Sequence, residues 1–280
     1  MIVIQHNYSE QETITPWGNA SAADHAALLK IEQSGAVLTV GLNRPAKRNA
    51  LNDGIILALQ GCFSAIPDTI GAVVIHGIGD HFSSGLDLSE LTERDATEGL
   101  VHSQMWHRVF DRIQYCRVPV IAALKGAVIG GGLELACAAH IRVAEPSAYF
   151  ALPEGQRGIF VGGGGSVRLP RLIGVPRMAD MMLTGRVYSA TEGASYGFSQ
   201  YLTEAGGSLP KALQLAERAA ANAPLTNFAV LQALPMIAEA NPQTGLLMES
   251  LMATVAQSDK EAKRRIREFL DRKTAKVKPT

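Results

Sequence analysis

Cysteine and aromatic residues are scarce in this sequence, which has three cysteines in 280 residues and 6% aromatic residues. Cys62, Cys116 and Cys137 are odd in number and far apart, so we expect free thiols in a reducing compartment rather than a disulfide framework. Neither paired cysteines nor a His-Glu-x-x-His sequence occurs, so no metal site is expected. No run of about 18 apolar residues is present, which argues against a membrane-spanning helix. These absences predict a cytoplasmic protein without a metal or a membrane partner.

A net charge is also lacking, because 26 Lys and Arg residues balance 26 Asp and Glu residues. Broad binding of nucleic acid needs a net basic face, so no nucleic-acid partner is expected. Hydrophobic residues make up 47% and charged residues 19%, as in globular proteins, and the chain is long enough for one domain with a sizeable core. Residues 1–27 are polar and lack a basic region followed by an apolar run. We interpret them as an N-terminal extension and not as a secretory signal.

Short apolar runs and helical periodicity alternate along the chain. Two segments with partial alternation, 28–32 and 37–42, flank Ser34-Gly35 and predict a hairpin. Strands are also predicted at 72–76, 118–124, 141–144 and 149–151, and helices at 53–66, 99–115 and 132–139. Beyond residue 165 the helices expected are 167–173, 176–184, 190–196, 210–222, 225–239, 243–251 and 259–276. The order predicts an α/β core of repeated strand–strand–helix units at 28–210 and a helical C-terminal part at 211–280.

A triple glycine, 130–132, lies between a predicted strand and a predicted helix. Backbone N–H groups at a helix N-terminus have no acceptor within the helix, and glycine lets a ligand approach them closely. Such a turn can stabilise a developing oxyanion, although a tight turn with close helix packing explains the glycines equally well. The glycine-rich turns match neither the P-loop nor the dinucleotide-binding pattern, and no Gly-x-Ser-x-Gly sequence is present. Nucleotide binding and serine-hydrolase chemistry are therefore not expected.

Two glutamates accompany the glycine turns. Glu134 lies between two leucines in the first turn of an apolar helix, where a carboxylate is costly unless it is paired or solvated. Glu154 lies in a short Pro-Glu-Gly turn. Each has a simpler explanation, because an acid favours a helix N-terminus and a turn is often at the surface. Together they suggest paired carboxyl groups that exchange protons with a substrate and water.

Four segments taken together resemble the crotonase superfamily, the enoyl-CoA hydratase/isomerase family. The segments are 42–51, 82–88, 126–136 and 152–165, and the similarity extends over 28–273. The resemblance implies a crotonase-like spiral of strand–strand–helix units with a helical C-terminal trimerisation part. It also implies an acyl-CoA substrate, no cofactor apart from the CoA of that substrate, and a homotrimer or a dimer of trimers.

The resemblance assigns roles to four residues. The backbone N–H groups of Leu86 and Gly131 match the family's oxyanion hole, which polarises the thioester carbonyl. Glu134 would orient and deprotonate a water that attacks Cβ of a 2-enoyl-CoA, and Glu154 would deliver a proton to Cα. Because both acids are present, a hydratase is favoured over an isomerase. The alternatives are an enoyl-CoA isomerase, an aryl-enoyl-CoA hydratase-lyase, and, from another class, a non-catalytic scaffold or RNA-binding member of the fold.

A further set of residues matches the family's CoA site. Lys47 and Arg48 would meet the CoA phosphates, although a solvated turn is an alternative reading, and the final helix would complete a neighbouring subunit's site. The full set is Lys47, Arg48, Ser84, Asp87, Leu88, Phe269 and Lys273, of which Asp87 is expected mainly to order its turn.

The chain departs from the family's pattern around the expected acyl pocket. Val161 stands where the family usually has proline, Leu86 is bulkier than the common alanine, and the run Gly155-Gln156-Arg157 is unusually polar. Met105, Trp106 and Phe110 are candidates for the wall of an acyl tunnel, although core packing on an amphipathic helix is the better interpretation. The acyl specificity therefore stays open at this point.

Overall fold

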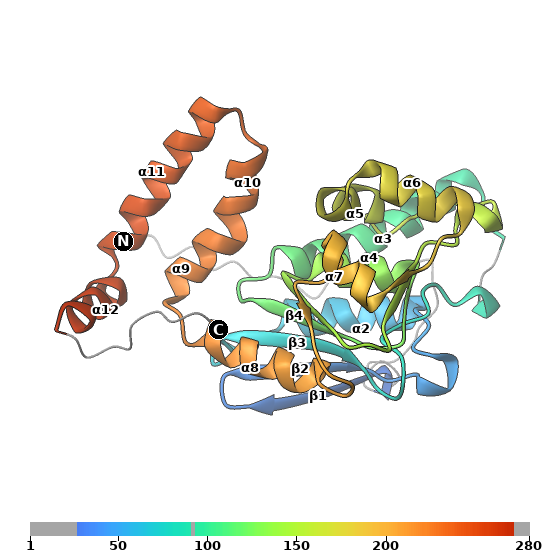
Figure 1. Cartoon of the computed structure of the whole chain (residues 1–280), viewed down its shortest axis with the longest axis horizontal. Coiled ribbons are helices and arrows are strands. Elements are labelled where there is room, and N and C mark those ends of the chain that lie inside the picture. Colours follow the sequence, from blue (N-terminus) through green and yellow to red (C-terminus); the bar gives the residue numbers. More distant parts are fainter. Residues whose placement is uncertain (1–26, 91–92, 272–280) are drawn as a thin grey trace, which may run out of the picture.

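Two sheets and the helices that cover them form the body of the molecule, and a helical arm projects from it (Figure 1). The computed structural model describes residues 27–90 and 93–271. The N-terminal extension therefore lies almost wholly outside the described residues, as does Lys273.

The larger sheet has six strands in the order β1-β2-β3-β4-β6-β9. The predicted hairpin is confirmed, because β1 and β2 pair antiparallel around a turn in which Gly35 has a φ of 56°. The other neighbouring strands pair in parallel, as expected when helices connect strands. The strands are β1 (Leu29–Ser34), β2 (Val37–Leu42), β3 (Ala72–Gly77), β4 (Val120–Leu124), β6 (Ile141–Ala144) and β9 (Tyr201–Leu202).

A smaller sheet of three strands carries the chain into the triple glycine. Its strands are β5 (Ala127–Ile129), β7 (Tyr149–Ala151) and β8 (Tyr188–Ser189), with β5 and β7 parallel and β7 and β8 antiparallel. The sequence analysis did not separate β5 from the glycine-rich turn, because three residues are too few to show a period.

Three helices of the body begin near the cavity described below. Asn52 caps α2 (Asp53–Ser64), its side chain accepting a hydrogen bond from the backbone N–H of Ile55. α3 (Ala96–Gln114) begins three residues before the predicted start, because Asp95 and Glu98 form a capping box. α4 (Gly131–Ala138) starts within the triple glycine and is buried along its whole length.

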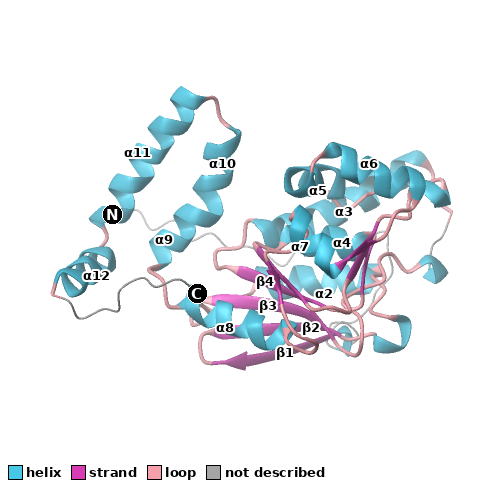
Figure 2. Cartoon of the chain, viewed as in Figure 1, coloured by secondary structure: helices cyan, strands magenta, loops and turns pink. Residues whose placement is uncertain are grey.

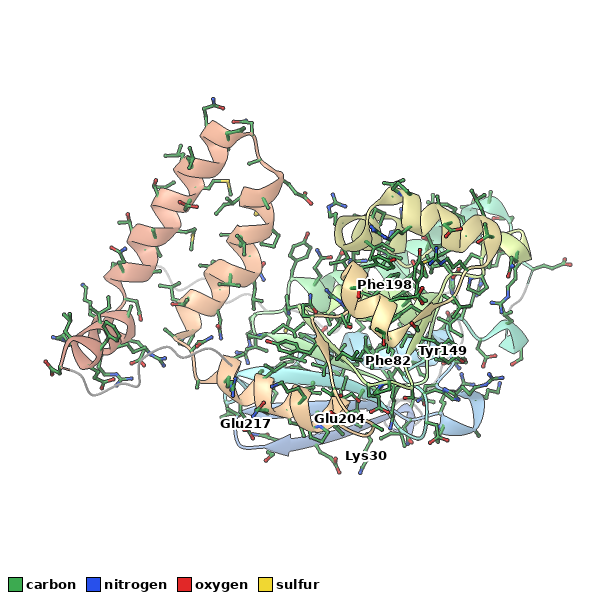
Figure 3. All side chains as sticks on the ribbon, viewed as in Figure 1. Lys30, Phe82, Tyr149, Phe198, Glu204 and Glu217 are labelled. Carbon is green, nitrogen blue, oxygen red and sulfur yellow. The ribbon has the colours of Figure 1, made fainter. Side chains whose placement is uncertain are left out.

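Two apolar clusters hold the body together. The larger one lies between the sheets and the helices, where Phe82 and Phe198 are almost fully buried, and the charged side chains of Lys30 and Glu217 lie at the surface (Figure 3). The smaller cluster lies on the other face of the large sheet, beneath α8 (Ser208–Ala220). The remaining helices of the body are α5 (Gly165–Ile173), α6 (Val175–Thr184) and α7 (Ala190–Tyr196), which Figure 2 shows together with the sheets.

The predicted division at residue 210 falls inside α8, which packs on the sheet. The helices that leave the body come after it, and the division into a core and a C-terminal part stays a prediction. The arm consists of α9 (Pro224–Phe228), a π-helical turn η4 (Ala229–Ala233), α10 (Leu234–Glu239), α11 (Pro242–Ser258) and α12 (Lys260–Leu270). We predicted one helix at 225–239, but the π turn interrupts it just before Pro235, which has no N–H to donate to the preceding turn.

The arm exposes many large apolar side chains. Leu246, Leu247 and Leu251 of α11 are each about 60% exposed, and Leu270 of α12 is 70% exposed. Among the described residues, no helix is both long and apolar enough to cross a bilayer. All three cysteines are free, and burial raises the pKa of Cys62 and of Cys137 to about 11, so both thiols stay protonated at neutral pH.

Candidate active site

A cavity of about 410 Å³ lies where the loop after β3, the start of α4 and the N-terminal half of α3 meet. Its lining contains all four residues that were predicted to carry a reaction: Leu86, Gly131, Glu134 and Glu154. Ser84 and Leu88, predicted to bind CoA, line it as well. The fold thus brings together residues from three separate segments of the sequence.

Leu86 and Gly131 both line this cavity, and neither backbone N–H donates to another described residue. Leu86 forms a parallel bridge with Leu51, in which Leu51 bonds to the carbonyl of Gly85 and to the N–H of Asp87, so the N–H of Leu86 points to the opposite side. Gly131 is the first residue of α4, and its N–H therefore has no acceptor within the helix. The two segments lie close together, because a Cβ at Gly85 would be 3.3 Å from the nitrogen of Gly131.

Two backbone amides hold the carboxyl group of Glu134. Its Oε1 accepts hydrogen bonds from the N–H groups of Gly163 (2.8 Å) and Gly165 (2.7 Å). The side chain is buried, and burial raises the pKa of Glu134, although the two amides and the charge of Arg168 favour the ionised form. Two amides on one oxygen fix the carboxyl group in one orientation.

Arg168 supports the loop that holds Glu134. Its Nη1 donates to the carbonyl of Gly163 (3.0 Å), and a Cβ at Gly164 would lie only 2.2 Å from that nitrogen. On its other side the buried guanidinium bonds to Asp111 and Gln114, both at 2.5 Å. Gly164 therefore leaves room for an arginine that holds the loop, whereas a Cβ at Gly163 would meet Phe110 and Glu134.

Glu154 has a buried oxygen without a partner. Its Oε2 has no hydrogen bond to any described residue, and the side chain is only 7% exposed. Burial raises the pKa of Glu154 to about 7, and the negative charge of Glu134 adds to the effect. A carboxyl group with such a pKa can both give and take a proton at neutral pH.

Trp106 covers the start of α4. A Cβ at Gly131 would lie 2.8 Å from Cζ3 of the indole, so glycine is required where the ring packs on the backbone. Trp106 is 4% exposed and also lines the cavity, whereas Met105 and Phe110 are buried and do not. The preferred interpretation of these side chains as core packing therefore holds for Met105 and Phe110, while Trp106 is part of the core and also borders the cavity.

A polar group at the cavity consists of Asp53 at the start of α2, His102 on α3 and Arg94, which precedes α3. His102 Nε2 lies 2.7 Å from Asp53 Oδ1, and Arg94 Nη2 lies 3.6 Å from Asp53 Oδ2. Burial opposes ionisation of Asp53, but the hydrogen bond with His102 and the charge of Arg94 lower its pKa. Both His102 and Arg94 line the cavity. The sequence analysis missed this group because Asp53, Arg94 and His102 match no motif and meet only in the folded chain.

The predicted phosphate-binding residues lie beside the cavity and outside its lining. The backbone N–H of Ser84 donates to the carbonyl of Arg48 (2.9 Å), which keeps the turn of Lys47 and Arg48 next to the loop of Leu86. Lys47 Nζ is 3.0 Å from Asp87 Oδ2, and Arg44 is 2.9 Å from the same oxygen. Burial opposes ionisation of Asp87, but hydrogen bonds from Ser89, Lys47 and Arg44 hold its pKa well below the usual range. These contacts are consistent with Asp87 ordering its turn.

Phe269, which was predicted to bind CoA, does not line this cavity. It lies on α12 and is 60% exposed, and α12 lies in the arm away from the body (Figure 1). Within residues 27–90 and 93–271, no group of three or more His, Cys, Asp or Glu side chains is arranged to hold a metal ion.

Comparisons with known proteins agree on one family. The model of the enoyl-CoA hydratase/isomerase family matches residues 32–279. The chain is 35% identical to the 2,3-dehydroadipyl-CoA hydratase of Escherichia coli, over 89% of this chain and 98% of that protein. It is 32% identical to the short-chain-enoyl-CoA hydratase of Clostridium acetobutylicum, over 79% and 85%.

Solved structures show the same fold. A provisionally assigned enoyl-CoA hydratase from Rhodopseudomonas palustris is 80% identical and superposes with a TM-score of 0.88, covering 92% of this chain and all of that chain. The enoyl-CoA hydratase of Bacillus anthracis is 29% identical, with a TM-score of 0.83, covering 88% and 96%. The predicted crotonase fold class is therefore confirmed, and the chain belongs to the enoyl-CoA hydratase/isomerase family.

Proposed function

We propose that the protein is an enoyl-CoA hydratase, which adds water across the double bond of a 2-enoyl-CoA thioester. The observation that carries the proposal is the pair of buried carboxyl groups, Glu134 and Glu154, which line one cavity together with Leu86 and Gly131. A hydration needs a base for the water and an acid for the carbon, and two carboxyl groups with raised pKa values can supply both. The names of the relatives, several of which are enoyl-CoA hydratases, support the same reaction.

In this mechanism Glu134 takes a proton from a water molecule while the oxygen of that water attacks Cβ. The hydrogen bonds from Gly163 and Gly165 occupy Oε1 of Glu134, so Oε2 is the oxygen we assign to the water. The electron pair of the double bond moves toward the thioester carbonyl, and Glu154 delivers a proton to Cα. The unpartnered Oε2 of Glu154 supports this role, since that atom has no competing contact among the described residues.

We assign the stabilisation of the charge that develops on the thioester oxygen to the N–H groups of Leu86 and Gly131. Support comes from their closeness and from the absence of a helical acceptor for Gly131. One such donor typically stabilises the transition state by about 3 kcal/mol. Backbone donors held by a strand bridge and a helix start need no rearrangement as the charge forms, which is what makes them effective.

We assign the CoA moiety to the side of the cavity next to Lys47 and Arg48. CoA enters only as part of the substrate, and no separate cofactor or metal is part of the proposal. Ser84, Asp87 and Leu88 would follow the pantetheine part. Lys47 forms an ion pair with Asp87, so its role in binding phosphate requires that it exchange this partner for the ligand.

We also propose a homotrimer, or a dimer of trimers, in the cytoplasm. The support is the projecting arm, whose exposed apolar side chains need a cover in water. Because Phe269 lies far along this arm, it would reach the CoA site of a neighbouring subunit rather than its own, and Lys273 follows it in the sequence.

A panel of enoyl-CoA thioesters tests the function. A 2-enoyl-CoA should lose its conjugated thioester absorbance and gain the mass of one water. If only 3-enoyl-CoA reacts, and gives 2-enoyl-CoA without added water, the protein is an isomerase and the proposal is wrong. Release of an aldehyde from an aryl-enoyl-CoA would instead indicate a hydratase-lyase.

A further inference from the structure

The lining of the cavity combines an apolar surface with polar groups. Trp106, Ile159 and Phe160 provide the apolar part, as an acyl chain requires. The lining also contains His102 and Arg157, which take part in neither the oxyanion hole nor the carboxyl pair. These two side chains raise the question of what the acyl group carries at its far end.

His102 is oriented by Asp53 so that one ring nitrogen remains for a ligand. Its Nε2 bonds to Oδ1 of Asp53 at 2.7 Å, and Arg94 lies near the other oxygen of that carboxylate. Asp53 is ionised, so Nε2 carries a hydrogen toward it. No hydrogen bond from the described residues reaches Nδ1 of His102, although the side chain is only 13% exposed.

Arg157 adds a positive charge to the same lining. It lies at the end of the 3₁₀ turn η3 (Gly155–Arg157), directly after Glu154, and is exposed at the cavity. No acidic side chain among the described residues lies within ion-pair distance of its guanidinium, whereas Arg94 is close to Asp53. The charge of Arg157 acts on the nearby carboxyl group of Glu154, but no ion pair occupies the guanidinium, which is therefore available to a ligand.

A purely hydrocarbon chain would displace water from His102 and Arg157. It would offer no hydrogen bond in place of the ones that water makes. Covering a polar group without giving it a hydrogen bond costs free energy, and a site built around such a group discriminates against a ligand that lacks the partner. A hydroxyl at the end of the acyl group would accept a hydrogen bond from the guanidinium of Arg157 and donate one to Nδ1 of His102. A carboxylate would accept from the guanidinium, and from Nδ1 when the ring carries a second proton.

On the assumption that the proposed hydration is correct, we infer that the preferred substrate is a 2-enoyl-CoA whose acyl group ends in an oxygen, as a carboxylate or a hydroxyl, bound by His102 and Arg157. These residues set specificity and do not touch the reacting atoms. Asp53 is a positioning residue, which holds the ring of His102.

The test compares three 2-enoyl-CoA thioesters with acyl chains of equal length that end in a methyl group, a hydroxyl or a carboxylate. For the unmodified enzyme, kcat/KM should be at least about tenfold higher for one or both oxygen-ended substrates than for the methyl-ended one. A preference for the carboxylate alone identifies an anionic substrate, and a comparable preference for the hydroxyl identifies an uncharged one. Equal or higher kcat/KM for the methyl-ended substrate overturns the inference.

Variants then assign the preference to residues. The ratio of kcat/KM for the oxygen-ended substrate to kcat/KM for the methyl-ended one should fall to near unity in His102→Phe or Arg157→Gln. If His102→Phe does not fold, His102→Gln, which keeps an N–H toward Asp53, takes its place. Arg218→Gln, at an exposed position on α8, is the matched control and should keep the ratio. Persistence of the preference in both site variants also overturns the inference. Failure of the proposed function looks different, because then none of the three substrates is hydrated.

Discussion

Replacing Glu154 with glutamine should make the protein more stable at alkaline pH. The carboxyl group is buried, its Oε2 has no partner among the described residues, and its pKa is raised from 4.5 to about 7. A group whose pKa is higher in the folded than in the unfolded state contributes stability below the unfolded pKa. That contribution is lost as the pH rises through the folded pKa. The folded protein is thus penalised for an ionised Glu154 above about pH 7.

The size of this penalty follows from the two pKa values. The gap between 4.5 and about 7, at about 1.4 kcal/mol per pH unit, corresponds to about 3 kcal/mol. Glutamine has a similar shape and no charge, so Glu154→Gln should gain about 3 kcal/mol in unfolding free energy, relative to the unmodified protein, between about pH 4 and about pH 8. Any constant effect of the amide cancels in this comparison of two pH values.

Urea denaturation at several pH values measures the effect. Glu217→Gln is the control, because Glu217 is exposed on α8 and its replacement removes a charge without removing a buried carboxyl group (Figure 3). A stability difference between Glu154→Gln and the unmodified protein that stays constant across the pH range would refute the reasoning. The expected combination of higher stability and lost turnover is the pattern of a residue kept for catalysis at the expense of stability.

Three further predictions concern the same site. Gly131→Ala should lower kcat by about a hundredfold or more, because its Cβ would lie 2.8 Å from Trp106; measured turnover close to normal would contradict this. Arg168→Lys should lower kcat more than it raises KM, because it loosens the loop of Gly163 that orients Glu134, and steady-state kinetics with circular dichroism as a folding control separate the two effects. The rate of hydration should fall as the pH rises through about 7, where the acid Glu154 loses its proton, and a pH–rate profile that stays flat from about pH 6 to about pH 9 would speak against that role.

The sequence predicts the parts of the site that lie within short segments. The triple glycine with Glu134 and the Pro-Glu turn with Glu154 are local patterns, and each has a physical reason for its residue types. The order of strands and helices follows from periodicity in the same way, and most predicted elements agree with the structure to within a few residues.

The remainder of the site depends on contacts between distant segments. Asp53 and His102 are 49 residues apart, and Arg168 reaches back to Asp111 across 57 residues. The two amides that hold Glu134 come from a glycine run whose sequence gives no hint of its partner. In the arm, the spacing of the apolar residues predicts helices. Only the structure shows that these apolar side chains are exposed.

The most direct test of the central claim is the hydration of crotonyl-CoA by Glu134→Gln and by Glu154→Gln, measured as formation of 3-hydroxybutyryl-CoA in proteins shown to be folded. Each variant should lose turnover by a factor of about a hundred or more, since each lacks a group that moves a proton. Turnover within a few-fold of the unmodified enzyme in both variants would contradict the assignment of the two carboxyl groups as the acid and base.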